Sequence, residues 1–192
     1  GVTTWAVRFA NTLAEKGRRV GVVLHKPRRT DSPGNYELDP RVRRFSAESL
    51  APMDELLGGA DIYKSVYLGA IDALRSERVV CMPSLMGDCY GIFAVCSRER
   101  SACLRVVGWA HLYSPYELRV LEHYASLISR FVGVSDELTA QLRSRLPVRA
   151  QHIENIPYGV EVPAVRVRTL GAAVRIAYVG RLDEDVKRVD VL

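Results

Sequence analysis

Two basic side chains follow an apolar run near the end of the chain. In "AYVGRLDEDVKR" (177–188), Arg181 comes directly after Gly180, and Lys187 follows six residues later. A guanidinium binds phosphate oxygens as a planar fork, and an ammonium binds them as a point charge. This pair could hold a diphosphate. The acids at 183–185 leave a second interpretation open, in which the segment is a solvated charged turn.

Histidines end two other apolar runs. His111 follows one in "VVGWAHLYSPYE" (106–117), and His25 ends the run at 19–25. An imidazole at such a position can hydrogen-bond a hydroxyl or accept a proton. The alternative for His111 is a histidine satisfied by the neighbouring backbone, and His25 has less support. We interpret His123 and His152 as packing or surface residues.

A glycine opens the first helical pattern. Gly1 precedes apolar residues at helical spacing in "VTTWAVRFANTLAE". The N-terminus of a helix offers free N–H groups and the positive end of a dipole, which suit a phosphate. Glycine lets a ligand approach the backbone closely. Alone the signal is weak, because many helices start after a glycine and bind nothing.

The elements that must position these residues alternate along the chain. Hydrophobic periodicity predicts helices over 2–16, 61–77, 89–99, 114–129 and 136–146, with Ser135 as the N-cap of the last. It predicts strands over 19–25, 78–84, 103–111, 130–135, 148–157 and 174–180, loops over 26–40, and a loop and helix over roughly 47–58. Such alternation predicts an α/β fold: a doubly wound, Rossmann-like parallel sheet with helices on both faces. Ligands bind such sheets at the carboxyl ends of the strands, where His25, His111, Ser135 and Arg181 fall.

Composition narrows the class of protein. The 192 residues are 48% apolar and 26% charged, and no apolar run is long enough to span a membrane. The net charge of +5 comes mostly from arginines, clustered at 18–19, 28–29 and 41–44. Two interpretations of these clusters are open. They are solvated surface charge, or they attract phosphates or an anionic membrane face. Four cysteines at intervals of eight, seven and seven residues match no zinc site and indicate buried free thiols in a reducing cytosol.

Five segments, taken in order, resemble one family. They are "GVTTWAVRFANTLAEKGRRVGVVLH", "VVGWAHLYSPYE", "FVGVSDELTAQL", "IENIPYGVEVP" and "IAYVGRLDEDVKRVDVL". The ordered set resembles the retaining glycosyltransferases of the GT-B fold, in glycosyltransferase family 4, which use nucleotide sugars. Two positions differ from the family pattern: Tyr158 takes the place of an Asn, and Arg188 takes a place where glycine is frequent.

The resemblance implies a role for four residues. Gly1 would approach the donor diphosphate, and His111 would contact the donor sugar near the reaction centre. Arg181 and Lys187 would hold the diphosphate and stabilise it as it leaves. The resemblance implies no metal and no cofactor, with the nucleotide sugar as donor substrate. It leaves the acceptor open: a sugar, a lipid-linked molecule or another small molecule.

The resemblance also implies a domain organisation. We expect an acceptor-side Rossmann-like domain over 1–157 that lacks its first strand, a linker over 158–173, and the beginning of a donor-binding domain over 174–192. We expect the rest of that domain, with a Glu-x7-Glu pair, to follow Leu192, and the 192-residue chain alone to have little or no transferase activity. The expected location is the cytoplasm, with peripheral contact at the inner face of the membrane as an option. The arginine-rich stretch 26–44 suggests a phosphorylated, acidic or membrane-borne acceptor.

Two rival classes stay open. The chain could be a non-catalytic GT-B-like or Rossmann-like module that binds a phosphorylated ligand or a partner. Nucleic-acid binding through the arginines ranks last, because the sequence has no recognition-helix arrangement and no interleaved basic and aromatic pattern.

Overall fold

The computed structural model of the chain describes residues 2–26, 37–51, 60–83 and 87–159. The chain divides into two compact units, Gly1–Tyr158 and Gly159–Leu192. All described helices and strands belong to the first unit. The linker expected over 158–173 lies outside the described residues beyond position 159, and so does the strand expected over 174–180.

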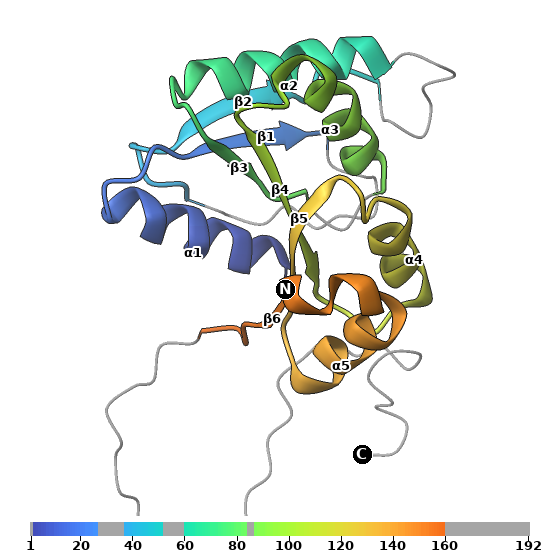
Figure 1. The fold of residues 1–192 in the computed structure, drawn as a ribbon. Helices are drawn as coiled ribbons and strands as arrows, with labels where there is room; N and C mark the ends of the chain where they lie inside the picture. Colours follow the sequence, from blue (N-terminus) through green and yellow to red (C-terminus); the bar gives the residue numbers. More distant parts are fainter. Residues whose placement is uncertain (1, 27–36, 52–59, 84–86, 160–192) are drawn as a thin grey trace, which may run out of the picture. The chain divides into compact units, whose positions relative to one another are not determined.

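Helices and strands alternate through the first unit (Figure 1). The helices are α1 (Val2–Glu15), α2 (Ala60–Ala73), α3 (Gly87–Arg100), α4 (Pro115–His123), α5 (Asp136–Arg145) and the 3-10 helix η2 (Pro147–His152). The strands are β1 (Gly21–His25), β2 (Arg43–Ala47), β3 (Val79–Cys81), β4 (Leu104–Ala110), β5 (Ile128–Gly133) and β6 (Ile153–Asn155).

Every pairing between the described strands is parallel, as the alternation predicts. The strands form two sheets, one of order β1-β2 and one of order β3-β4-β5-β6. Their carboxyl ends are in register: His25 lies opposite Ala47, and Ala110 lies opposite Gly133, which in turn lies opposite Asn155. Loops that follow neighbouring strands therefore leave the same edge of each sheet.

Helices cover both faces of the strands, which confirms the Rossmann-like α/β class. In β1, Val22 packs against a small apolar cluster that contains Ala10 and Ala14 of α1, whereas Val23 packs against the larger core that contains residues of α2. In β4, Val106 and Ala110 belong to that larger core, while Trp109 contacts α1. The core thus forms on one face, and α1 covers the other.

The ends of several elements follow from local chemistry. Gly17 ends α1 with a φ of 72°, a left-handed conformation that costs glycine little. The helix expected over 114–129 ends at His123, and Ile128 already begins β5. The strand expected over 148–157 was partly wrong. Pro147 begins the 3-10 helix η2, and only Ile153–Asn155 pair in a sheet.

The four cysteines are free thiols, and Cys81, Cys89 and Cys96 are buried in the core, as predicted. Cys103 is half-buried. In the part of the chain that the structure describes, no helix has both the length and the apolar character needed to span a bilayer.

Candidate functional site

His111 lies directly after β4, among aromatic side chains from three separate segments. Its ring centroid lies 4.8 Å from that of Trp5 in α1, 5.9 Å from that of Trp109 in β4, and 5.8 Å from that of Tyr158. The rings of Trp109, His111 and Tyr158 are nearly parallel, with interplanar angles of 10° and 11°. We call these four residues, with Phe9, the ring cluster.

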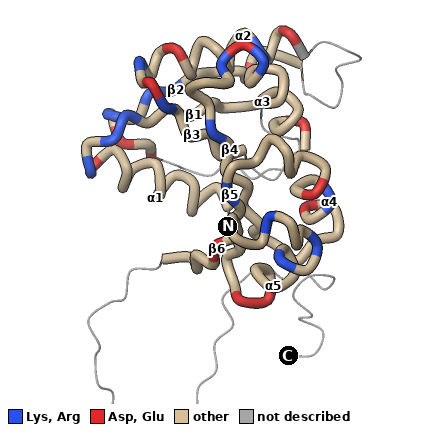
Figure 2. Tube along the Cα trace, viewed as in Figure 1, with Lys and Arg blue, Asp and Glu red and all other residues tan. Residues whose placement is uncertain are grey.

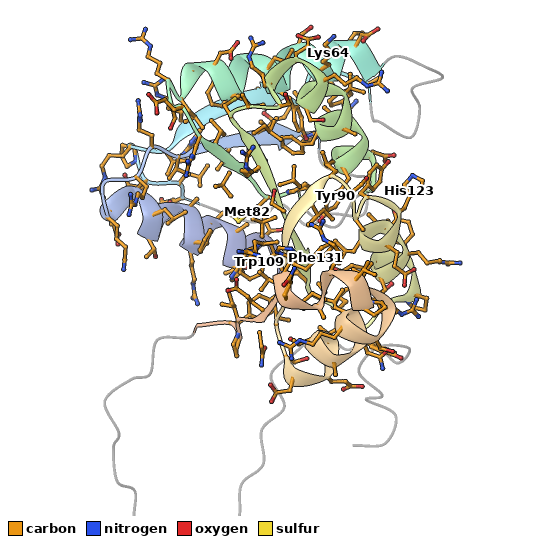
Figure 3. All side chains as sticks on the ribbon, in the orientation of Figure 1. Lys64, Met82, Tyr90, Trp109, His123 and Phe131 are labelled. Carbon is orange, nitrogen blue, oxygen red and sulfur yellow. The ribbon has the colours of Figure 1, made fainter. Side chains whose placement is uncertain are left out.

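The helical repeat brings α1 to this edge. Trp5 and Phe9 are four residues apart, so they lie on one face of the helix, and their rings stack at 5.4 Å. Trp5 also lies 4.6 Å from Trp109 (ring centroids), and Figure 3 shows Trp109 near the amino end of α1. The first turn of α1 is therefore beside His111, at the carboxyl end of β4.

The His111 imidazole is neutral at ordinary pH. The residue is 7% exposed, and burial lowers the pKa of its ring to about 4. Its Nδ1 lies 2.5 Å from the Tyr158 hydroxyl, and Nε2 has no hydrogen-bond partner among the described residues. The ring can therefore offer Nε2 as a hydrogen-bonding atom without carrying a charge.

Glu117 fixes the backbone at His111. Its carboxylate accepts the N–H of His111 at 2.8 Å and the N–H of Leu112 at 3.0 Å. Burial raises the pKa of the Glu117 carboxyl, and these two backbone hydrogen bonds act in the opposite direction. The turn between β4 and α4 is thus held by a side chain from the first turn of the following helix.

Trp109 adds an unsatisfied donor to the ring cluster. The residue is 7% exposed, and its indole Nε1 has no hydrogen-bond partner among the residues that the structure describes. A buried donor without an acceptor costs about 1–3 kcal/mol, so each such group in a folded protein calls for an explanation.

His25 belongs to a different environment. It ends β1, its Nε2 lies 2.8 Å from the Tyr67 hydroxyl, and its ring stacks on Tyr63 at 5.3 Å. Burial lowers its pKa. Tyr67 in turn donates to Cys89 Sγ at 3.5 Å. These contacts tie His25 to the core rather than to the ring cluster.

Ser135 has the capping role that its position predicts. Its hydroxyl accepts the N–H of Leu138 at 3.2 Å and so caps the N-terminus of α5. His123 is exposed at the end of α4 and has its ring against Tyr124, and His152 lies beside Arg130 on the surface. All three therefore have structural or surface roles.

Gly1, Arg181 and Lys187 lie outside the described residues, and so do Arg28 and Arg29. Within residues 2–26, 37–51, 60–83 and 87–159, no group of three or more His, Cys, Asp or Glu side chains is placed to hold a metal ion.

Sequence reasoning missed five members of the site: Trp5, Phe9, Trp109, Tyr158 and Glu117. Trp5 and Trp109 were given no role in the site, although they are the only two tryptophans in the chain. The sequence could have indicated a hydrogen-bonding role for Glu117, because "SPYE" has the Ser-x-x-Glu spacing of a capping box. The structure uses that spacing differently. The Ser114 side chain makes no cap bond, and Glu117 reaches past it to His111 and Leu112.

Comparison with known proteins gives no family assignment: no protein-family model matches the sequence, and no curated protein matches it.

Proposed function

We propose that this chain contributes the acceptor-side domain of a retaining glycosyltransferase that uses a nucleotide-sugar donor. The observation that carries the proposal is the contact between the first turn of α1 and His111, with Trp5 and His111 ring centroids 4.8 Å apart. The family resemblance implies that the start of this helix and this histidine both contact the nucleotide-sugar donor. The contact supports that pairing at a strand end where α/β proteins bind ligands.

His111 would act as a neutral hydrogen-bonding group. If Nδ1 accepts the proton of the Tyr158 hydroxyl, the ring hydrogen sits on Nε2 and can be donated to an oxygen of the sugar. A neutral donor suits this position because the transferred sugar gains positive charge as the diphosphate leaves. Glu117 would hold the turn that carries His111, and Arg181 and Lys187 would bind the diphosphate.

The Trp109 indole N–H fits the same interpretation. It is buried beside His111, and no described residue accepts a hydrogen bond from it. A bound polar ligand that brings an oxygen to this side of the ring cluster would remove the cost of the unpaired donor.

The test is turnover of nucleotide sugars by the protein encoded by the whole reading frame in which this chain lies. UDP-, GDP- and ADP-linked sugars would be supplied with simple sugar acceptors and with lipid extracts, and nucleoside diphosphate release would be measured. We expect release with at least one donor, and a loss of about a hundredfold or more in His111→Ala. His123→Ala is the matched control, because His123 is exposed on α4, and it should keep full activity.

Two outcomes would contradict the proposal. One is an absence of nucleoside diphosphate release from every donor. The other is equal activity of the His111→Ala and His123→Ala variants. Both tryptophans belong to the ring cluster, so intrinsic fluorescence reports binding there directly. A fluorescence change on adding a nucleotide sugar without turnover would favour the non-catalytic binding module instead.

A further inference from the structure

Arginines from two separate parts of the chain line one hollow at the end of α1. Arg18 and Arg19 lie between α1 and β1, and Arg41 and Arg43 lie at the start of β2. The hollow has a volume of about 280 Å³, and the apolar residues Ala14, Val20 and Leu74 also line it. Figure 2 shows the basic residues gathered where α1 ends and β1 and β2 begin. We call this the arginine hollow.

The arginine hollow is separate from the ring cluster. Trp5 and Ala14 are nine residues apart on α1, which corresponds to about 14 Å of helix. The arginine hollow lies at the amino ends of β1 and β2, whereas His111 follows the carboxyl end of β4. A ligand in the arginine hollow would therefore not contact the ring cluster.

Two of the guanidinium groups are held in place by carbonyls at the end of α2. Arg19 Nη1 donates to the carbonyl of Arg75 at 2.6 Å, and Arg43 Nη1 donates to the carbonyl of Ala73. A guanidinium has five N–H donors, so each keeps others for a ligand. Such anchoring lowers the entropy lost on binding, because the side chains are already ordered.

The charge balance stays positive after the local negative groups are counted. Asp39 pairs with Arg41 at 2.7 Å, and this hydrogen-bonded contact lowers the pKa of Asp39 to about 2. The carboxyl ends of α1 and α2 contribute about half a negative charge each. Glu15, at the end of α1, also acts on Arg41. Four arginines minus Asp39, Glu15 and the two helix ends leave about one positive charge, and none of the described residues that line the arginine hollow is a carboxylate. The positive charge of the arginines therefore exceeds the negative charge of the helix ends and nearby carboxylates.

Arg18 is the group with no structural task. Its side chain is exposed and makes no hydrogen bond or ion pair with the described part of the chain. The positive charge of Arg18 is repelled by the other arginines that line the hollow, and a bound anion would reduce this repulsion. Planar guanidinium forks match phosphate oxygens in pairs.

We propose that the arginine hollow is a second binding site, for a compact anion with two or more linked phosphate groups. The size favours this class, because 280 Å³ is at the small end of ligand sites and too small for an extended polymer. The inference does not depend on the proposed transferase activity, since it uses no residue of the ring cluster.

The test is calorimetric titration of the 192-residue chain with inorganic pyrophosphate, at low ionic strength and without divalent ions. We expect saturable binding that is at least about tenfold tighter than binding of orthophosphate, and that weakens as salt is added. Arg18→Ser should weaken pyrophosphate binding by about tenfold, because one charge-assisted contact is lost.

Arg8→Ser is the matched control. Arg8 is also an exposed arginine, it lies on α1, and its loss changes the net charge equally, but it does not line the arginine hollow. This variant should bind pyrophosphate like the parent chain. Equal weakening in both variants, or no saturable binding in the parent, would overturn the proposal.

Two further measurements distinguish pyrophosphate binding in the arginine hollow from binding at the ring cluster and from binding to lipid phosphate. Pyrophosphate bound at the ring cluster would change tryptophan fluorescence, and a change that accounts for all the binding would overturn the second site. Sedimentation with phosphatidylcholine vesicles that contain one-third phosphatidylglycerol tests a lipid phosphate instead. Binding to these vesicles without binding of pyrophosphate would assign the arginines to a membrane surface, and the proposed site would be wrong.

Discussion

The Glu117 carboxylate accepts two successive backbone N–H groups, from His111 and Leu112, and so fixes the residue at the centre of the candidate site. The acceptor comes from a helix that begins only after the turn it holds. The turn and the helix therefore have to form together, and the position of His111 depends on a side chain six residues further along the chain.

Glu117→Gln should destabilise the protein by about 2 kcal/mol. The amide oxygen can accept only one of the two N–H groups in the original geometry, and the amide NH2 then faces the other donor. Denaturant unfolding measures the change. Glu122→Gln, on the same helix, removes an exposed ion pair with Arg145 at 2.9 Å and should cost less than about 1 kcal/mol. Equal losses in the two variants would contradict the assigned role of Glu117.

Stability should fall as the pH drops from about 6.5 to about 4, because of His111. The pKa of its ring is about 4 in the folded protein and near 6.5 in the unfolded chain, so in this window the unfolded state binds more protons. The expected loss is about 2 kcal/mol, less than the full shift would give, since solvent reaches part of the ring.

Comparison with His111→Asn isolates this contribution from other titrating groups. The raised pKa of Glu117 acts in the opposite direction, because the folded state keeps that proton as the pH rises above the usual value. The lowered pKa of His25 acts in the same direction as that of His111. Denaturant unfolding at several pH values should give a shallower pH dependence in His111→Asn, and an unchanged slope would refute the shift at His111.

Gly133→Ala should cost about 3 kcal/mol. A Cβ at this position would lie 2.5 Å from Thr139 Oγ1 and 2.8 Å from the Thr139 backbone nitrogen, so α5 would have to move away from the end of β5. Gly69→Ala, inside α2, is the control. Its Cβ would meet no atom within 4 Å, and it should stabilise the protein by about 0.5–1 kcal/mol. Melting temperatures that shift in the same direction would show that the close approach at Gly133 is wrong.

Ser135→Ala should cost about 1 kcal/mol, because the N–H of Leu138 loses its acceptor. Ser114 precedes α4 in the same way, but its side chain makes no cap bond, so Ser114→Ala should change stability by less than about 0.5 kcal/mol. Thermal unfolding of the two variants measures the difference. A larger loss in Ser114→Ala than in Ser135→Ala would contradict the capping assignment.

Local sequence patterns were sufficient for most of the fold. The apolar spacing in 2–15 and the glycine after it predicted α1, and Ser135 predicted the start of α5. Strand β2 was missed, because "RRFSA" exposes three of its five residues and has little β-branched character. Its position depends on the parallel ladder with β1, which pairs residues 22 positions apart in the sequence. Local periodicity does not contain such a pairing.

The candidate site was only partly predictable for a similar reason. His111 could be found, because a polar residue at the end of an apolar run points to a strand end. Its partners Trp5 and Tyr158 lie far away in the sequence and come together only through packing. The arginine hollow was visible only as separate clusters, because α1 and β2 must be assembled before Arg18 and Arg43 line one cavity.

The buried thiols make the core resistant to alkylation and oxidation while the protein stays folded. Burial raises the pKa of Cys81 to about 12 and that of Cys96 to about 11, so almost no reactive thiolate exists at neutral pH. Cys103 is only half-buried, and solvent reaches it without unfolding. The order in which the four cysteines become modified would therefore record the order in which β3, α3 and the segment before β4 open, and no label has to be introduced.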